Sequence, residues 1–234
     1  MNYDLFLRQA REQVELLDYP THVQRINQWR GVQQSAASAL KSLPNRPVSD
    51  LRDQVALLRG LPEHIDQHIA LLREGIALGV VPPVITLRDV PQQVRNMIID
   101  TPENNPLLQG FYDLPNSVPA EEGELLRGEA IFIYQEEILP KWQEFETFLT
   151  EEYLPAAPAS IAASDRPNGV AWYSIEVRQQ TTLEVTPDEV HEIGLAEVAR
   201  IRGEMEWVKA WAGFDGSLEE FFMFLRTDPQ SYHT

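Results

Sequence analysis

The stretch TPDEVHEIGLAEVARIRGEMEWVKAWAG, residues 186–213, is the segment on which our interpretation of the fold depends. Thr186 can cap a helix, Pro187 suits the first helical position, and Glu189 can close a capping box onto the Thr186 N–H. Gly213 supplies the left-handed residue that often follows a helix. The segment therefore predicts a long packed helix, with one apolar stripe made of Val190, Gly194, Val198, Ile201, Met205, Val208 and Ala212.

The same helix contains His191-Glu192, the first half of a helical zinc motif. Such a site needs a second imidazole four residues further on, so that both rings reach the metal from one face. Leu195 occupies that position. We therefore expect no metal ligand here, and we interpret His191 as a residue that borders the apolar stripe.

Composition restricts the classes of partner. The chain has 234 residues, 43% of them hydrophobic, so it can bury a substantial core in one domain or two small ones. Its formal charge of −17 repels phosphate backbones and anionic membranes, and nucleic acid is not an expected partner. Cysteine is absent, which removes disulfides and thiolate chemistry. We expect no signal peptide and no membrane span in residues 1–234, and the compartment stays open.

Helical periodicity continues through the N-terminal part, residues 1–80, which we interpret as helical hairpins. One helix is expected over residues 2–17, and a second that starts at a Thr21 cap and carries Trp29 on its apolar face. Residues 49–77 predict two helices, or one helix kinked at Pro62.

Beyond residue 80 we expect a third antiparallel layer, with a helix capped by Thr86 or Asp89 that reaches about Ile99. Residues 100–119 then form a packed irregular connection. Residues 170–182 fit either a helix or a strand, and we choose a helix because every other element is helical.

Residues 120–153 hold the longest periodic pattern. Pro140 lies inside it, so we expect a kink near residues 136–140. The outer face carries ten Glu, which we interpret as a solvated surface. The stripe consists of Leu126, Ala130, Tyr134, Ile138, Trp142, Phe145, Leu149 and Tyr153.

His64 and His68 stand four residues apart on an expected helix, the spacing that lets two imidazoles share one ion. The segment HIDQH would be an inverted zinc motif if Gln67 were Glu. Without that carboxylate the pair is expected to border the core. The sequence also contains no G-x-G-x-x-G, no Walker lysine loop and no G-x-S-x-G elbow, so phosphate cradles and a hydrolase nucleophile are unsupported.

The C-terminal segment, residues 217–225, begins with a Ser217/Glu220 capping box and places five apolar residues in succession from Phe221 to Leu225. A helix that is apolar on all sides is normally buried on all sides. We therefore expect this end to meet a partner, which is either the remainder of the same polypeptide or a second subunit.

Three segments together resemble the bacterial family catalogued as domain of unknown function 885. They are LLREGIALGVVPP at 71–83, EEILPKWQEFETFLTEEYLPAA at 136–157, and the segment from NGVAWYSIEV at 168 to the end of FLRTDPQSY at 232. The resemblance covers roughly residues 50–234.

This resemblance implies a mostly helical fold akin to the large helical zinc metallopeptidases, with a His-Glu and Pro-Gly-His-His type motif downstream of the segment that here reads Asp228-Pro229-Gln230. Zinc is therefore expected only in that downstream part. Residues 81–234 would be the portion of the family core that lacks the downstream zinc-motif part. A peptide substrate is possible for the full protein. In the family, the stretch that matches Tyr173, Arg178, Thr181 and Thr182 could face a cleft.

We expect an all-α, elongated multi-helix bundle, a single helical domain or fragment over residues 1–234. Its expected role is a non-catalytic helical portion of a zinc-peptidase-like protein, inactive alone, with no catalytic, cofactor-binding or metal-binding residue of its own. The alternative is a self-contained helical interaction module. Native continuation of the reading frame beyond Thr234 would favour the first.

Overall fold

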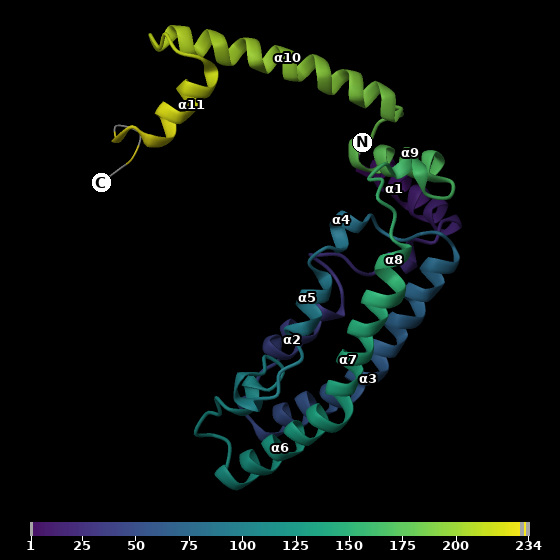
Figure 1. The fold of residues 1–234 in the computed structure, drawn as a ribbon, viewed down its shortest axis with the longest axis vertical. Helices are drawn as coiled ribbons and strands as arrows, with labels where there is room; N and C mark the ends of the chain where they lie inside the picture. Colours follow the sequence, from purple (N-terminus) through teal and green to yellow (C-terminus); the bar gives the residue numbers. More distant parts are fainter. Residues whose placement is uncertain (1, 230–231, 233–234) are drawn as a thin grey trace. The chain divides into compact units, whose positions relative to one another are not determined.

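The computed structural model describes residues 2–229 and 232, and these contain no strand beyond an isolated bridge between Asn27 and Arg30 (Figure 1). The expected all-α multi-helix bundle is therefore confirmed. No described helix is both long and apolar enough to cross a membrane. The α-helices are α1 Asn2–Glu15, α2 Val32–Ser42, α3 Val48–Ala77, α4 Val84–Leu87, α5 Val90–Arg95, α6 Ala120–Ile133, α7 Leu139–Phe148, α8 Leu154–Ala156, α9 Gly169–Thr181, α10 Pro187–Trp211 and α11 Leu218–Thr227.

The chain divides into two compact units. The first, here called the core unit, is Gln13–Val170. The second combines the N-terminal residues up to Glu12 with those from Ala171 onward, and we call it the α9–α11 unit. Helices α1 and α9 each begin in one unit and end in the other.

In the core unit, α3 lies beside one helical run that extends through α6, α7 and α8 (Figure 1). The two are parallel, because ion pairs join their residues in the same order along both. Parallel neighbours need a return connection, and α4, α5 and residues 96–119 provide it. The antiparallel layer expected after residue 80 is therefore only this return, and within the core unit α3 and the α6–α8 run point in the same direction.

The ion pairs between α3 and the α6–α8 run form a ladder. On α3 its members recur every seven residues, which keeps them along one edge of the helix. The ladder consists of Arg52–Glu122 at 3.3 Å, Arg59–Glu129 at 2.7 Å, Asp66–Lys141 at 2.8 Å and Arg73–Glu152 at 2.7 Å.

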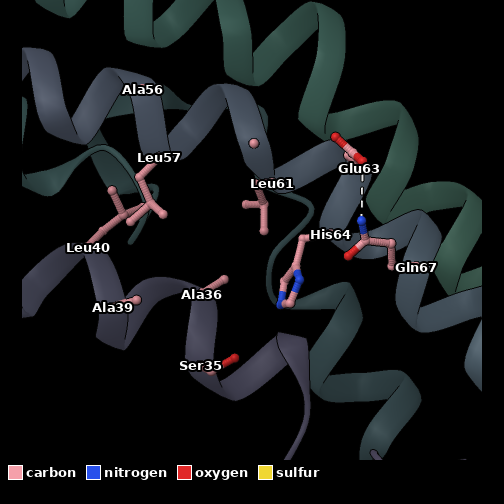
Figure 2. Close-up of a pocket in the computed structure, with 11 residues that line it drawn as sticks. Ser35, Ala36, Ala39, Leu40, Ala56, Leu57, Leu61, Glu63, His64 and Gln67 are labelled. Atoms are coloured by element: carbon pink, nitrogen blue, oxygen red, sulfur yellow. Dashed lines mark hydrogen bonds between the residues drawn. The ribbon is translucent and has the colours of Figure 1, made fainter.

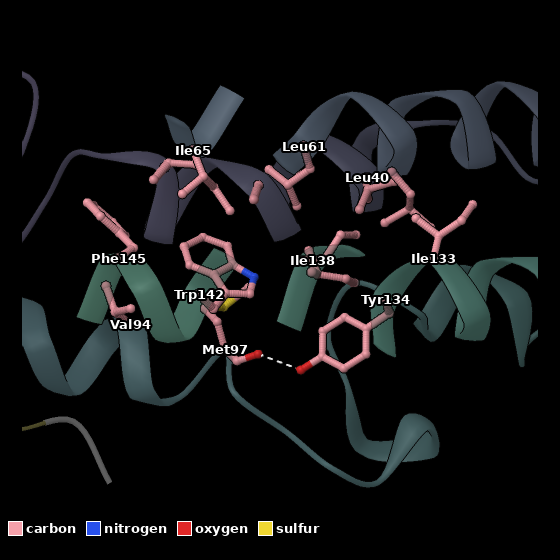
Figure 3. Close-up of a cluster of buried hydrophobic side chains, with 14 of the residues drawn as sticks. Leu40, Leu61, Ile65, Val94, Met97, Ile133, Tyr134, Ile138, Trp142 and Phe145 are labelled. Atoms are coloured by element: carbon pink, nitrogen blue, oxygen red, sulfur yellow. Dashed lines mark hydrogen bonds between the residues drawn. The ribbon is translucent and has the colours of Figure 1, made fainter. Parts of the chain in front are cut away.

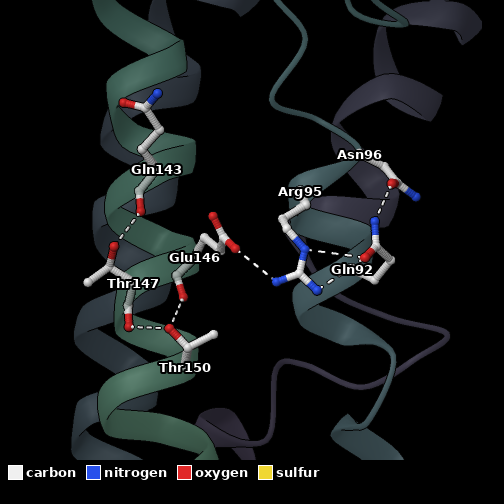
Figure 4. Close-up of polar contacts among 7 residues, drawn as sticks. All are labelled: Gln92, Arg95, Asn96, Gln143, Glu146, Thr147 and Thr150. Carbon is white, nitrogen blue, oxygen red and sulfur yellow. Dashed lines mark hydrogen bonds and ion pairs between the residues drawn. The ribbon is translucent and has the colours of Figure 1, made fainter.

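The acidic face of residues 120–153 is exposed, as expected, but much of it is not merely solvated. Besides the ladder, Glu146 accepts a hydrogen bond of 2.9 Å from Arg95 of α5, whose guanidinium is also held by Gln92 (Figure 4). Exposed pairs of this kind individually contribute little to the free energy of unfolding. Together, however, these pairs favour one register of α3 and α5 against the α6–α8 run.

The apolar stripe predicted for residues 120–153 is buried at every position, from Leu126 to Tyr153. It packs against α3 residues such as Ile65 and Leu61 and against Val94 and Met97 on the opposite side (Figure 3). The prediction of this core is confirmed.

Two π-helical turns interrupt this run, Tyr134–Ile138 and Leu149–Tyr153, and each ends two residues before a proline, Pro140 or Pro155. A proline lacks the N–H of the helical ladder, and its ring collides with the carbonyl four residues earlier. A wider π turn shifts the pairing by one residue and accommodates the ring. Where we expected a kink, near residues 136–140, the structure therefore has a π turn within a continuous helical run.

Several local predictions were wrong. Only a 3-10 turn, Thr21–Val23, follows Thr21, and α2 begins at Val32. The Asn27 side chain accepts the N–H groups of Trp29 and Arg30, so it builds a turn where we predicted helix and turns Trp29 out to solvent. By contrast, α3 passes through Pro62 as one helix.

The helix expected to reach Ile99 is two short ones, α4 and α5. Neither candidate cap acts as one. The Thr86 hydroxyl donates to the Pro83 carbonyl, and the Asp89 carboxylate pairs with Arg88.

Candidate functional site

The residues that the family resemblance singled out, Tyr173, Arg178, Thr181 and Thr182, lie on α9 and just after it. The helix interpretation of residues 170–182 is confirmed. The helical interpretation groups Val170, Tyr173 and Val177 on one apolar face. Of these three only Val177 is buried, together with Trp172 and Ile175, whereas Tyr173 is 42% exposed.

Arg178 lies in the last turn of α9. The Thr181 hydroxyl donates to the Val177 carbonyl at 2.8 Å and accepts from the Leu183 N–H at 3.2 Å, so it caps the helix end. A cleft-lining role for these residues stays a prediction.

Thr182 adopts a left-handed conformation with φ of 58°, which is uncommon for a β-branched residue. Arg8 of α1 supports this turn. Its Nη1 donates to the Thr182 carbonyl at 2.8 Å, and it also pairs with Glu184 and, at 3.2 Å, with the buried Glu12. Our sequence analysis missed Arg8. Its four-residue spacing from Glu12 was the available signal.

The start and end of α10 are as predicted. Thr186 and Glu189 form the capping box, and Gly213 is left-handed with φ of 71°. The packed helix, however, was a wrong prediction for this chain, because none of the 25 residues of α10 is buried. Val198, in the middle of the stripe, is 64% exposed. The stripe exists, but too little of the chain lies over it to bury it.

Helix α11 covers the stripe only in part. It too begins with the predicted capping box, between Ser217 and Glu220. Leu218 and Phe221 are buried, and Phe214 packs against Phe221 with ring centroids 5.3 Å apart. A hollow of about 380 Å³ remains between the two helices. We call the exposed apolar residues here the α10–α11 surface: Val198, Ile201, Met205, Trp207, Val208, Trp211, Phe222, Met223, Phe224 and Leu225.

His64 and His68 of α3 lie in contact with each other. His64 and His68 lie edge to face with ring centroids 4.5 Å apart, and the His68 Nδ1–H donates to the His64 carbonyl at 3.0 Å. Burial, the main cause, and the nearby charges of His64 and Arg25 lower the pKa of His68. Nowhere in the described residues do three His, Cys, Asp or Glu gather closely enough to hold an ion.

A groove of about 440 Å³ lies between α2 and α3 (Figure 2). Its walls carry small residues such as Ala36, Ala39 and Ala56, which leave room between the helices. Gly60 faces open space, and His64 stands at the rim beside Gln67 and Glu63. The groove offers apolar contact, one imidazole, and the Glu63 carboxylate, which accepts a hydrogen bond of 3.2 Å from Gln67.

Comparisons with known proteins extend this picture. The family model described as "Bacterial protein of unknown function (DUF885)" matches residues 1–234. Among solved structures, the chain is similar to "the putative lipoprotein from Colwellia psychrerythraea", with a TM-score of 0.78 and 22% sequence identity. That match covers 88% of this chain and 36% of the other, so the chain spans about a third of its relative's length. At that identity the likeness concerns the fold alone. No curated protein matches the chain.

Proposed function

Because this chain belongs to the DUF885 family of bacterial proteins of unknown function, we propose that it is the non-catalytic helical portion of a larger, zinc-peptidase-like protein. In this proposal the core unit is a scaffold, and the α10–α11 surface receives the remainder of the polypeptide. The peptidase character comes from the motif that the family resemblance places downstream of Asp228-Pro229-Gln230. Of these three residues, Gln230 lies outside the described part of the chain.

One observation carries the proposal: α10 has 25 residues and buries none of them. Isolated helices are only marginally stable in water, and most helical stability in proteins comes from packing an apolar face. A continuous apolar stripe on an unburied helix therefore indicates a partner that the 234 residues do not supply. The greater length of the similar solved structure supports a partner within the same polypeptide.

The proposal places no zinc on the described residues. A zinc site of the expected kind needs at least three His, Asp or Glu ligands, and the described residues offer no such group. His191-Glu192 cannot supply it, because Leu195 stands where the second imidazole belongs. In this proposal the zinc ligands come from the additional segment.

The test compares the 234-residue chain with a polypeptide extended by the downstream half of its own reading frame. We expect the chain alone to hydrolyse no peptide, and the extended protein to hold about one zinc per chain and to hydrolyse peptides in a zinc-dependent way. A zinc-free, inactive extended protein would overturn the peptidase part. Peptide hydrolysis by the chain alone would overturn the non-catalytic role.

The alternative, a self-contained helical interaction module, is favoured by one observation. The core unit has its own continuous cluster of buried apolar side chains, from Ile26 to Tyr153. The mass of the native protein, measured by immunoblot from its own cells, separates the two. A native product of about 27 kDa, the mass of this chain, supports the module, and a substantially larger product supports the proposal above.

A further inference from the structure

A rigid turn in the core unit presents an exposed tryptophan. Asn27 builds the turn through its Oδ1, which accepts the N–H groups of Trp29 at 2.8 Å and Arg30 at 2.9 Å. The side chain of the buried Gln33 donates to the Asn27 carbonyl at 3.1 Å. The Gln93 side chain donates to the Gln28 carbonyl at 3.0 Å. The result is a well-anchored turn whose largest side chain, Trp29, is 80% exposed.

Two arginines beside this tryptophan lack a carboxylate partner. Arg25 donates its Nε–H to the His22 carbonyl at 2.8 Å, which leaves the rest of its guanidinium available. Within the described residues neither Arg25 nor Arg30 forms an ion pair, although the chain has 36 acidic residues against 19 basic ones. Other arginines of the core unit do find carboxylates, among them Arg52, Arg59, Arg73 and Arg95.

These groups converge on one cleft of about 570 Å³, which we call the Arg25–Arg30 cleft. Trp29, Ser35 and His68 also line it, and no acidic residue does. The charge of Arg25 reaches His68, where it contributes to the lowered pKa after burial, the first cause, and His64. The cleft is therefore a local positive field on a strongly acidic protein.

From this arrangement we infer that the Arg25–Arg30 cleft binds a small organic anion that carries a planar aromatic ring. The two guanidinium groups match the paired oxygens of a carboxylate or phosphate, and the indole of Trp29 offers a flat apolar face for the ring. The Ser35 hydroxyl can donate a further hydrogen bond. This inference does not depend on the proposed peptidase relationship.

The overall charge of −17 opposes the approach of any anion. At an ionic strength of about 0.1 M, however, charges further than about 10 Å away are largely screened. Inside the cleft the two arginines therefore dominate. For the same reason binding should weaken as salt is added.

Calorimetric titration of the 234-residue chain with four probes tests the inference. Benzoate and phenyl phosphate carry both a ring and a charge, benzamide has the ring without the charge, and inorganic phosphate has the charge without the ring. We expect the first two to bind. Benzamide should bind at least about tenfold more weakly, because it lacks the charge that pairs with the arginines. Inorganic phosphate should bind about three- to tenfold more weakly than phenyl phosphate, because it lacks the ring that stacks on Trp29. Equal binding of benzamide and benzoate would overturn the role of the charge, and equal binding of inorganic and phenyl phosphate would overturn the role of the ring.

Matched variants locate the site. Arg30→Gln should weaken benzoate binding about tenfold. Arg46→Gln, which removes the same charge outside the cleft, should leave it unchanged. Trp29→Ala should weaken binding about three- to tenfold through lost stacking. Each variant must melt like the parent, and Arg30→Lys should restore part of the affinity of Arg30→Gln. An equal loss in Arg30→Gln and Arg46→Gln, or no heat of binding in the parent, would contradict the inference.

Discussion

The hydroxyl of Tyr134 donates a hydrogen bond of 2.9 Å to the carbonyl of Met97, and the same oxygen accepts the N–H of Ile99 at 2.9 Å (Figure 3). Tyr134 begins the first π turn, and Met97 and Ile99 lie just beyond α5. One side chain thus ties the return connection to the longest helical run. Burial raises the pKa of Tyr134, so the hydroxyl stays protonated and able to donate.

Tyr134→Phe should therefore cost about 1–3 kcal/mol of unfolding free energy, because it leaves a buried carbonyl and a backbone N–H without partners. Urea titration followed by circular dichroism measures this. The matched control is Tyr112→Phe, since the Tyr112 hydroxyl bonds to no other described residue and its ring keeps its contact with Arg127. Equal losses in the two variants would show that the Tyr134 hydroxyl does not stabilise the fold.

Trp142 lies at the centre of the core with 0% of its surface exposed. Trp142→Ala should destabilise the core unit by about 3–5 kcal/mol, through lost apolar burial and the cavity left behind. Glu144→Ala, two residues away, removes only an exposed ion pair of 2.9 Å with Lys141 and should cost less than about 1 kcal/mol. If both variants lose the same stability in urea, the core described for this helix is wrong.

The α10 capping box predicts a local pH dependence. The Glu189 carboxylate accepts the Thr186 backbone N–H at 2.8 Å and then the Thr186 hydroxyl, and these bonds hold the pKa of Glu189 below its usual 4.5. The helix start is therefore stabilised above pH 4.5, and this stabilisation is lost as the pH falls through the lowered pKa. Amide chemical shifts at residues 187–190 should report fraying in acid.

Thr186→Ala should produce similar fraying at neutral pH, at a cost of about 1 kcal/mol. Glu192→Gln, an exposed change outside the box, serves as the control and should leave the acid transition in place. A transition that persists unchanged in Glu189→Gln would show that another group causes it.

Metal removal should not affect the chain. His64 and His68 offer two imidazoles, and His68 already donates its Nδ1–H to a carbonyl. We expect elemental analysis to find well below one zinc per purified chain, and EDTA to leave the melting temperature unchanged. Near-stoichiometric zinc that disappears in His64→Ala would instead identify this pair as a metal site.

The features that the sequence predicted correctly depend on residues that are close together in the chain. The capping boxes at Thr186 and Ser217 and the left-handed Gly213 involve residues within a few positions of one another. The stripe from Leu126 to Tyr153 has one strong period, and burial of such a stripe requires only some apolar partner.

The features that the sequence did not predict depend on contacts between residues far apart in the chain. Arg52, Arg59, Asp66 and Arg73 stand at seven-residue steps in the sequence, but their role appears only once α6–α8 is known to run parallel to α3. Likewise, the turn at Asn27 depends on support from Gln33 and Gln93, which no periodicity indicates. Among the candidate site residues, Thr182 carries a strained backbone whose support by Arg8 joins distant segments.

The sequence contains a repeated pattern from which the two π turns could have been predicted. Glu-Glu-Ile-Leu-Pro at 136–140 and Glu-Glu-Tyr-Leu-Pro at 151–155 repeat the same order of residue types, and both produce the same turn before the proline. The repetition of this pattern within one helical run indicates that both prolines perturb the helix in the same way. One proline considered alone does not indicate a π turn.

We propose that the α10–α11 surface receives the remainder of a longer polypeptide, and hydrogen exchange along α10 tests this proposal most directly. In the 234-residue chain the α10 amides should exchange much faster than those of α3, because α10 buries no residue. In the extended polypeptide the amides around Val198 and Met205 should become strongly protected. Slow exchange of α10 in the chain alone, or no gain of protection in the extended protein, would contradict the account.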